Sequence, residues 1–155
     1  MKIYIAFDHG GFELKKALIA FLSKLGHDVE DCGAFTLDQE DDYPDFIRPC
    51  AEKVAADPGS FGIIGGGSGQ GEAMVANRVK GARAAVFYGE PSRKQTDSEG
   101  KKIDMIVSTR DHNDANMLSI GSRFLTEEEI KAKIVQFIST PFSDHPRHKR
   151  RIAKF

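Results

Sequence analysis

A glycine-rich segment that ends in a carboxylate carries the strongest chemical signal in the sequence. Residues 65–72 read GGGSGQGE, with five glycines in the first seven positions. Such a run lets the backbone turn tightly and point several N–H groups into one concavity that can hold an anion. Glu72 beside it has the chemistry of a general base. A base next to an oxyanion site is typical of proton abstraction alpha to a carbonyl, where an enediolate must be stabilised as it forms.

Two nucleotide-binding interpretations fit this segment poorly. The dinucleotide fingerprint G-x-G-x-x-G fails, because its sixth position falls on Gln70 or Glu72 rather than on glycine. A phosphate-binding P-loop needs a lysine after its last glycine, and Glu72 stands at that position, where it would repel a triphosphate. The alternative without catalysis is a flexible turn in which Glu72 complements the dipole of the following helix.

A basic C-terminal segment is the second chemical signal. Residues 141–155 carry five Lys or Arg and one Asp, a net +4 against −5 for the rest of the chain. Arg147 and Arg151 are four residues apart and would share one helix face. Two guanidinium groups on one face can bind a phosphate. The alternative is a solvated face or a weak nucleic-acid patch.

The strands and helices that position these groups can be predicted from alternating apolar runs and helical patterns in the sequence. Residues 3–7, 61–64, 82–87 and 117–121 read as strands buried on both faces, and residues 28–32 as a weaker strand. Helical spacing covers residues 12–25, 44–56, 72–79 and the stretch after a capping box that starts at Thr126. This order predicts an α/β fold, a Rossmann-like three-layer αβα domain with a five-stranded parallel sheet and a C-terminal helical arm. No internal repeat or composition break marks a second domain, so we expect one domain over residues 1–155.

Ligands of such sheets bind beyond the carboxyl ends of the strands. Three chemically loaded segments are expected there: residues 8–11, residues 65–72 and the region just before Asn116. Because all three segments are expected at the same edge of the sheet, we predict that the active site lies in a crevice there.

Composition excludes several functional classes. With 22 Lys+Arg against 23 Asp+Glu in 155 residues, no net field drives the chain onto nucleic acid or an anionic membrane. No apolar stretch is long enough to span a bilayer, and the N-terminus does not have the pattern of a signal peptide. We therefore expect a cytoplasmic protein with no membrane and no nucleic-acid partner.

The sequence predicts no metal site. His145 and His148 lack the spaced cysteine or carboxylate partners of a metal centre. The acids of residues 38–42 lack the spacing of a calcium-binding loop. Cys32 and Cys50 fit strand and helix patterns, and we expect them to be small buried hydrophobic residues.

Six motifs occur in order along the chain: DHGGF (8–12), DYPD (42–45), GGSGQGE (66–72), ANR (76–78), HNDAN (112–116) and RHKRR (147–151). In this order they resemble the ribose-5-phosphate isomerase B family, which also contains the galactose-6-phosphate isomerase subunits. The resemblance runs over nearly the whole chain. It implies a cofactor-free aldose–ketose isomerase of sugar phosphates. It also implies a homodimer, with a tetramer as the alternative, whose sites are shared across the interface that residues 141–155 help to form.

The resemblance assigns roles to individual residues. Many family members carry a catalytic cysteine where this chain has Gly66, whereas a second branch uses a glutamate at the end of the glycine loop. This chain resembles the second branch, which makes Glu72 the base and His112 the group that opens the sugar ring. Phosphate is expected on Arg123, Arg147 and Arg151. The substrate-binding set is Asp8, His9, Tyr43, Gly67, Ser68, Gly69, Gln70, Gly71 and Asn113.

Simpler roles remain open for three of these residues. Asp8 would also serve as the cap of the next helix. Ser68 would serve as a turn former and Tyr43 as a packing residue in a Tyr-Pro turn.

Another departure from the family pattern bears on the substrate. About a dozen extra residues lie within residues 89–106, ahead of His112. We predict isomerisation of ribose 5-phosphate to ribulose 5-phosphate. The alternatives are a six-carbon aldose phosphate, allose 6-phosphate or galactose 6-phosphate, and a non-catalytic sugar-phosphate-binding homologue. A nicotinamide oxidoreductase is disfavoured because its fingerprint is absent.

Overall fold

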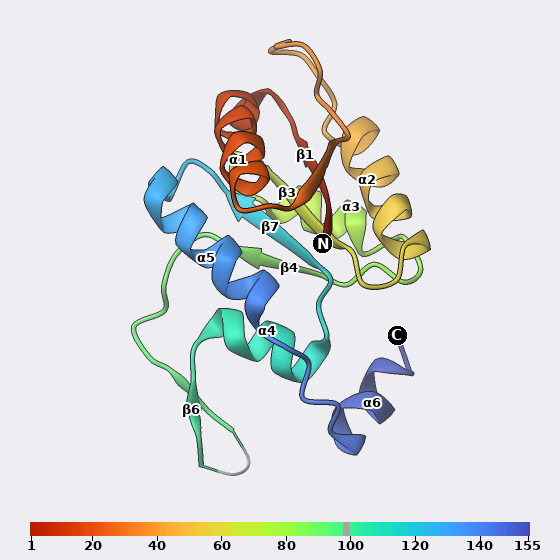
Figure 1. The fold of residues 1–155 in the computed structure, drawn as a ribbon, viewed down its shortest axis with the longest axis vertical. Coiled ribbons are helices and arrows are strands. Elements are labelled where there is room, and N and C mark those ends of the chain that lie inside the picture. Colours follow the sequence, from red (N-terminus) through yellow and green to blue (C-terminus); the bar gives the residue numbers. More distant parts are fainter. Residues whose placement is uncertain (98–99) are drawn as a thin grey trace.

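Five parallel strands form one sheet at the centre of the molecule (Figure 1). The computed structural model describes residues 1–97 and 100–155. The strands are β1 (Lys2–Phe7), β2 (Asp28–Asp31), β3 (Phe61–Gly66), β4 (Ala84–Phe87) and β7 (Met117–Gly121), in the spatial order β2-β1-β3-β7-β4. Every neighbouring pair in this sheet is parallel. The predicted five-stranded parallel sheet is confirmed.

Helices cover both faces of the sheet (Figure 1). Successive residues of a strand point to opposite faces, so β1 sends Ile3, Ile5 and Phe7 into one apolar cluster and Tyr4 and Ala6 into the other. The first cluster packs under α1 (Phe12–Lys24), α4 (Met105–Asn113) and α5 (Glu127–Ser139). The second packs under α2 (Pro44–Ala56) and α3 (Gln70–Ala76). A short 3₁₀ turn, η1 (His9–Gly11), joins β1 to α1, and the C-terminal helix is α6 (Pro146–Ile152).

Local signals place several helix ends where the sequence predicts them. Helix α2 begins at Pro44 and ends at Ala56, as its pattern predicts. The capping box at α5 is confirmed, since the Thr126 side chain accepts from the Glu129 backbone N–H while the Glu129 carboxylate accepts from that of Thr126. Helix α3 starts at Gln70, two residues earlier than expected, so the end of the glycine loop is already its first turn.

A hairpin inside the extra segment and the helix that follows it were not expected from the sequence. Residues Gln95–Thr96 (β5) and Lys102–Ile103 (β6) pair as an antiparallel hairpin, and α4 follows directly, with Asp104 as its N-cap. Residues 98–99 of this segment lie outside the described part of the chain. The strands β5 and β6 are too short to show an apolar period in the sequence. Helix α4 shows no clear one because it buries only Ile106 and Arg110.

The position of α4 corrects one expectation about the site. Helix α4 leads the chain into the start of β7, so its last residues, His112 and Asn113, lie near the amino edge of the sheet. The carboxyl edge receives instead the segments that follow β1, β3 and β7, namely Asp8, the glycine loop and Ser122–Arg123. The prediction that the region before Asn116 joins the other two segments at one edge is therefore wrong.

Two further expectations concern burial and membranes. Cys32 and Cys50 are both buried, as predicted. Within residues 1–97 and 100–155, no helix has the length and apolar character needed to cross a membrane.

A buried lysine attaches α1 to the segment that leaves β2. Lys15 is only 1% exposed. Its ammonium group donates to both carboxylate oxygens of Asp31, at 2.7 and 2.8 Å, and to the carbonyl oxygen of Ala34 at 2.5 Å. Three charge-assisted bonds therefore compensate one buried cation, which is the condition under which such a charge is tolerated.

Replacing Lys15 by Ala should destabilise the fold by about 3 kcal/mol, the cost of removing one partner of a buried ion pair. The adjacent Lys16→Ala is the matched control, because the Lys16 ammonium is exposed and contacts only Glu13 and the Phe12 ring, both in the same helix, among the described residues. Its loss should cost less than about 0.5 kcal/mol. Urea unfolding of the two variants measures both values. Equal destabilisation by the two substitutions would contradict a structural role for the buried pair.

Candidate active site

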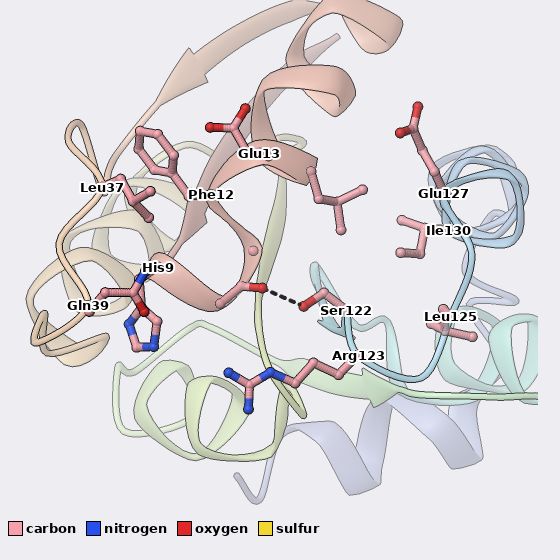
Figure 2. A pocket seen from close by; sticks show the side chains of 13 residues that line it. His9, Phe12, Glu13, Leu37, Gln39, Ser122, Arg123, Leu125, Glu127 and Ile130 are labelled. Carbon is pink, nitrogen blue, oxygen red and sulfur yellow. Dashed lines mark hydrogen bonds between the residues drawn. The ribbon is translucent and has the colours of Figure 1, made fainter.

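Ser122 joins the carboxyl ends of three strands. It follows β7, and its hydroxyl oxygen lies 2.6 Å from the carbonyl oxygen of Gly66 at the end of β3. The same hydroxyl lies 3.1 Å from the carbonyl oxygen of Gly10 in the turn after β1 (Figure 2). The backbone N–H of Ser122 also donates to Gly66, at 3.0 Å. These contacts keep the β1 turn and the glycine loop in register with each other.

In the glycine loop, the carbonyl groups of Gly67 and Gly69 accept hydrogen bonds. The carbonyl oxygen of Gly67 accepts from the Arg123 backbone N–H at 3.1 Å. That of Gly69 accepts from the Ser119 hydroxyl at 2.6 Å. In residues 1–97 and 100–155, no acceptor is found for the backbone N–H groups of Gly67, Ser68 or Gly69. Free donors beside occupied carbonyls form the kind of concavity that binds an anion.

Gly69 is the N-cap of α3 and has a backbone φ of 75°, in the left-handed region. A Cβ atom at this position would also lie 2.8 Å from the carbonyl carbon of Ile120. Only glycine meets both demands. The sharp turn at Gly69 directs α3 so that Glu72, in the first turn of the helix, points back over the end of β3.

Glu72 is buried, with 4% of its surface exposed. Its Oε1 atom fills the space that a side chain at Gly66 would occupy, so a Cβ atom on Gly66 would overlap it. Burial raises the pKa of Glu72, its own backbone N–H opposes that rise, and the charge of Asp8 adds to it. The carboxylate is therefore a stronger base than an exposed glutamate.

Asp8 is the second buried acid of the site. Burial raises its pKa, while a hydrogen bond from the Gly10 backbone N–H to its Oδ1, at 2.9 Å, opposes the rise. The bond makes Asp8 the N-cap of η1, so the simpler capping role holds in the structure. Its Oδ1 also lies 3.0 Å from the Cβ position of Gly66, next to the Glu72 carboxylate. Asp8 therefore both caps the turn and lines the space in front of Glu72.

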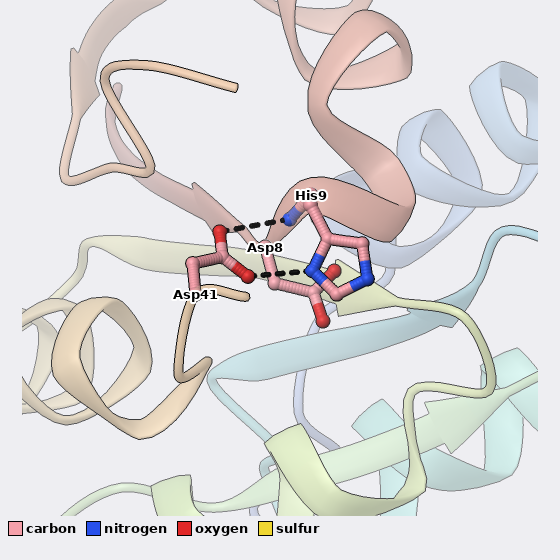
Figure 3. Close-up of side chains that lie close together, drawn as sticks. All are labelled: Asp8, His9 and Asp41. Carbon is pink, nitrogen blue, oxygen red and sulfur yellow. Dashed lines mark hydrogen bonds and ion pairs between the residues drawn. The ribbon is translucent and has the colours of Figure 1, made fainter. Parts of the chain in front are cut away.

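His9 is held by a carboxylate from a distant loop (Figure 3). Its Nδ1 lies 2.6 Å from Oδ1 of Asp41, and its backbone N–H donates to Oδ2 of the same residue at 3.0 Å. The hydrogen bond to Asp41 is the largest cause of a raised pKa at His9, so the imidazolium form is favoured. From the sequence, Asp41 is considered only as one of the acids of a calcium-binding loop. Its contact with His9 is not predicted, because no local sequence pattern links residues 32 positions apart.

Asp8, His9 and Asp41 are also the described residues that come close enough to hold a metal ion, with ligand atoms within 4.8 Å of one another. The geometry favours another role. A histidine binds a metal through a ring nitrogen lone pair that the imidazolium form lacks, and the hydrogen bond to Asp41 raises the pKa of His9 and so favours the imidazolium form. The arrangement fits an oriented imidazolium better than a metal centre, and the absence of a metal stays a prediction.

One cavity of about 460 Å³ collects most of the groups predicted for the base half of the site. Gly69 is buried and Gln70 is exposed, and neither is part of its lining. Arg123 reaches the cavity from the segment after β7 and lies beside the glycine loop (Figure 2). The residues that line this cavity are Asp8, His9, Tyr43, Gly67, Ser68, Gly71, Glu72, Arg123 and Phe124.

The remaining predicted residues lie elsewhere. His112, Arg147 and Arg151 line a second cavity of about 460 Å³, between α4, α6 and the β5–β6 hairpin. The His112 and His148 rings are 4.4 Å apart there. Burial lowers the pKa of His148, and the charges of His112 and His145 lower it further. Asn113 lines a separate cavity, next to β4. Among the described residues, none lines both the Glu72 cavity and the His112 cavity.

Comparison with known proteins gives one consistent family. A family model described as Ribose/Galactose Isomerase matches residues 3–155. The chain is 43% identical to a ribose-5-phosphate isomerase B of Mycolicibacterium paratuberculosis over 152 residues, which are 98% of this chain and 87% of the relative. It is 38% identical to a probable ribose-5-phosphate isomerase B of Mycoplasma pneumoniae, covering 98% and 91% of the two chains.

Solved structures agree with this similarity. The crystal structure of a ribose-5-phosphate isomerase B from Mycoplasma genitalium with bound ribulose 5-phosphate matches with a TM-score of 0.83 and 36% identity, over 99% of this chain and 92% of that one. The corresponding enzyme of Thermotoga maritima matches with a TM-score of 0.84 and 35% identity, over 99% and 95% of the two chains.

The buried charge of Glu72 predicts a gain of stability when it is removed. With its pKa raised in the folded state, Glu72 costs no stability below its ordinary pKa, and the cost grows as the pH rises toward the raised value. Glu72→Gln should therefore raise Tm at about pH 7.5, by about 2–4 °C for each kcal/mol of relieved cost. The gain should vanish near pH 4. Thermal unfolding at both pH values tests this, with the exposed Glu52→Gln as control. A Tm lowered by Glu72→Gln at neutral pH would contradict a destabilising buried charge.

Proposed function

The chain belongs to the ribose/galactose isomerase family, and from that premise we propose that Glu72 is the base with which it interconverts ribose 5-phosphate and ribulose 5-phosphate. The family resemblance seen in the motifs is confirmed, and the protein is an aldose–ketose isomerase. The glutamate base, the roles of the other site residues and the sharing of sites between copies are the proposed part.

One observation carries the assignment of the base. The Glu72 carboxylate occupies the space in front of Gly66, the position at which many family members have their catalytic cysteine. A side chain at position 66 and the observed carboxylate exclude each other sterically. The position of the carboxylate supports the proposal that it acts in place of the missing thiol, and its raised pKa makes it a better proton acceptor.

The reaction then moves protons between neighbouring atoms. Glu72 removes the proton from C2 of the open-chain aldose, and the electrons of that bond form a C1–C2 double bond while O1 takes the negative charge. The protonated Glu72 returns its proton to C1, and the proton of the C2 hydroxyl passes to O1 as the C2 carbonyl forms. No net charge is created. The free N–H groups of Gly67, Ser68 and Gly69 support the role of stabilising the transient oxyanion.

Of the groups predicted for ring opening and phosphate binding, the Glu72 cavity contains only Arg123 among the described residues. His112, Arg147 and Arg151 line the other cavity, at the far edge of the sheet. We infer that a second copy of the chain brings these three residues to the Glu72 cavity of the first. Residues 141–155 would then lie at the dimer interface, where their charge of +4 faces a body with a charge of −5.

The choice of a five-carbon sugar rests on the relatives. Those at 43% and 38% identity are named for ribose 5-phosphate, and the Mycoplasma genitalium structure contains ribulose 5-phosphate. The six-carbon allose 6-phosphate and galactose 6-phosphate remain the alternatives that an assay must include.

Purified protein should convert ribose 5-phosphate in D₂O with solvent deuterium appearing at C1 of the ribulose 5-phosphate and at C2 of the ribose 5-phosphate that the reverse reaction re-forms, because Glu72 exchanges its proton with water. Glu72→Gln should lower kcat by about 10²–10⁴-fold, the usual contribution of a general base. Activity should rise with pH through the raised pKa of Glu72, so its acidic limb should lie above that of an ordinary glutamate. NMR and a ketose assay over a pH series measure these effects, with EDTA-treated enzyme expected to stay active. An unchanged kcat for Glu72→Gln would rule out this base.

Sharing of the site predicts complementation between two inactive variants. Glu72→Gln and His112→Asn, refolded together, should recover about a quarter of the wild-type activity, because half of the randomly formed dimers would hold one intact site. Each variant refolded alone is the control. Recovery no higher than the sum of these controls would mean that both residues act within one chain.

A further inference from the structure

The segment between β4 and α4 builds a hairpin beside the phosphate-binding half of the proposed site. Strands β5 and β6 pair Gln95 with Ile103 and Thr96 with Lys102. Their ends are closed by a hydrogen bond from the Asp97 backbone N–H to the Lys101 carbonyl, at 2.9 Å, and by one from the Lys101 backbone N–H to Oδ1 of Asp97, at 2.8 Å. Figure 1 shows this hairpin projecting from the sheet on the side where α4 and α6 lie.

The hairpin is attached to α4 close to His112. The Ser108 hydroxyl donates to Oε1 of Gln95 at 2.8 Å. Ser108 lies four residues before His112, so the attachment and the imidazole share one face of α4. At the base of the hairpin, Ile103 is 3% exposed, and Asp104 caps α4 and accepts from the Gln136 amide at 2.7 Å. The hairpin is therefore fixed on both the cavity side and the core side.

Three cationic side chains face the cavity between the hairpin and α6. Lys101 comes from the hairpin, and Arg147 and Arg151 come from α6. No ion pair joins any of these three to a carboxylate of residues 1–97 or 100–155. The other titratable groups that line the cavity are Asp97, Asp111, His112, His145 and His148. Three cations in one cavity of about 460 Å³, with no ion pair to a carboxylate of the described residues, form a site for a multiply charged anion.

We propose that Lys101 is a further phosphate-binding residue, which the extra hairpin adds to Arg147 and Arg151. The proposal rests on the proposed function, which places the sugar phosphate in this cavity. A lysine ammonium on its flexible stem acts as a point charge that follows the phosphate, whereas the two guanidinium groups bind it in a fixed geometry. Because the phosphate does not change during the proton transfer, Lys101 should act equally on the ground state and the transition state.

Lys101→Ala should therefore raise KM for ribose 5-phosphate about tenfold, the effect of losing one hydrogen bond to a charged group, with kcat nearly unchanged. The inhibition constant of inorganic phosphate should rise by a similar factor. Lys101→Arg should restore most of the affinity. The matched control is Lys102→Ala, which removes the same charge from the next residue, outside the cavity lining. Equal KM values for Lys101→Ala, Lys102→Ala and the unchanged protein would overturn the proposal.

Failure of this proposal can be told apart from failure of the proposed function. If the unchanged protein does not isomerise ribose 5-phosphate, the proposed function fails, and calorimetric titration with inorganic phosphate still decides the role of Lys101. Weaker phosphate binding by Lys101→Ala, with Lys102→Ala unaffected and both variants unfolding at the temperature of the unchanged protein, supports the site. Unaltered phosphate binding by Lys101→Ala excludes it.

Discussion

The site depends on a buried carboxylate that occupies the space left by a missing side chain. Gly66 ends β3 without a Cβ atom, and Glu72 fills the room in front of it. Two separate structural features hold Glu72 and Gly66 in this arrangement. The left-handed turn at Gly69 starts α3 at the angle that brings Glu72 back, and Ser122 fixes the carbonyl of Gly66 against the β1 turn. Because a buried charge costs stability, the fold accepts a local penalty to keep a strong base in place.

The parallel sheet imposes a second constraint. All five strands run in one direction, so a loop that follows a strand and a loop that precedes one lie at opposite edges. Glu72 belongs to the first kind, and His112 belongs to the second. The two groups therefore lie at opposite edges of the sheet within one copy of the chain, which supports the proposal that a second copy brings them to one sugar. The opposite charges of the C-terminal segment and the body favour such a pairing.

The sequence predicted the sheet, the bounds of α2 and the capping box of α5 well, because apolar periodicity and end signals are local properties. It failed at α4, where Arg110 is buried by donating to the carbonyl oxygens of Thr140 and Ala115. A buried arginine breaks the apolar stripe that marks a helix. With α4 missed, the segment with His112 was placed at the wrong edge. The pair of His9 and Asp41 was missed for another reason, since a loop contact across 32 residues leaves no periodic signal.

The distribution of charge explains why a divided site suits this chemistry. Burial raises the pKa of both Asp8 and Glu72, and the charge of Asp8 adds to the rise at Glu72. The positive charges of His9 and Arg123 oppose the rise at Asp8. The three cations that we propose to bind the phosphate would lower the pKa of Glu72 and weaken the base if they lay next to it without a counter-charge. In the proposed dimer the second copy brings them to the phosphate of the sugar, whose negative charges offset them. The base can thus stay strong in a site that also binds an anion.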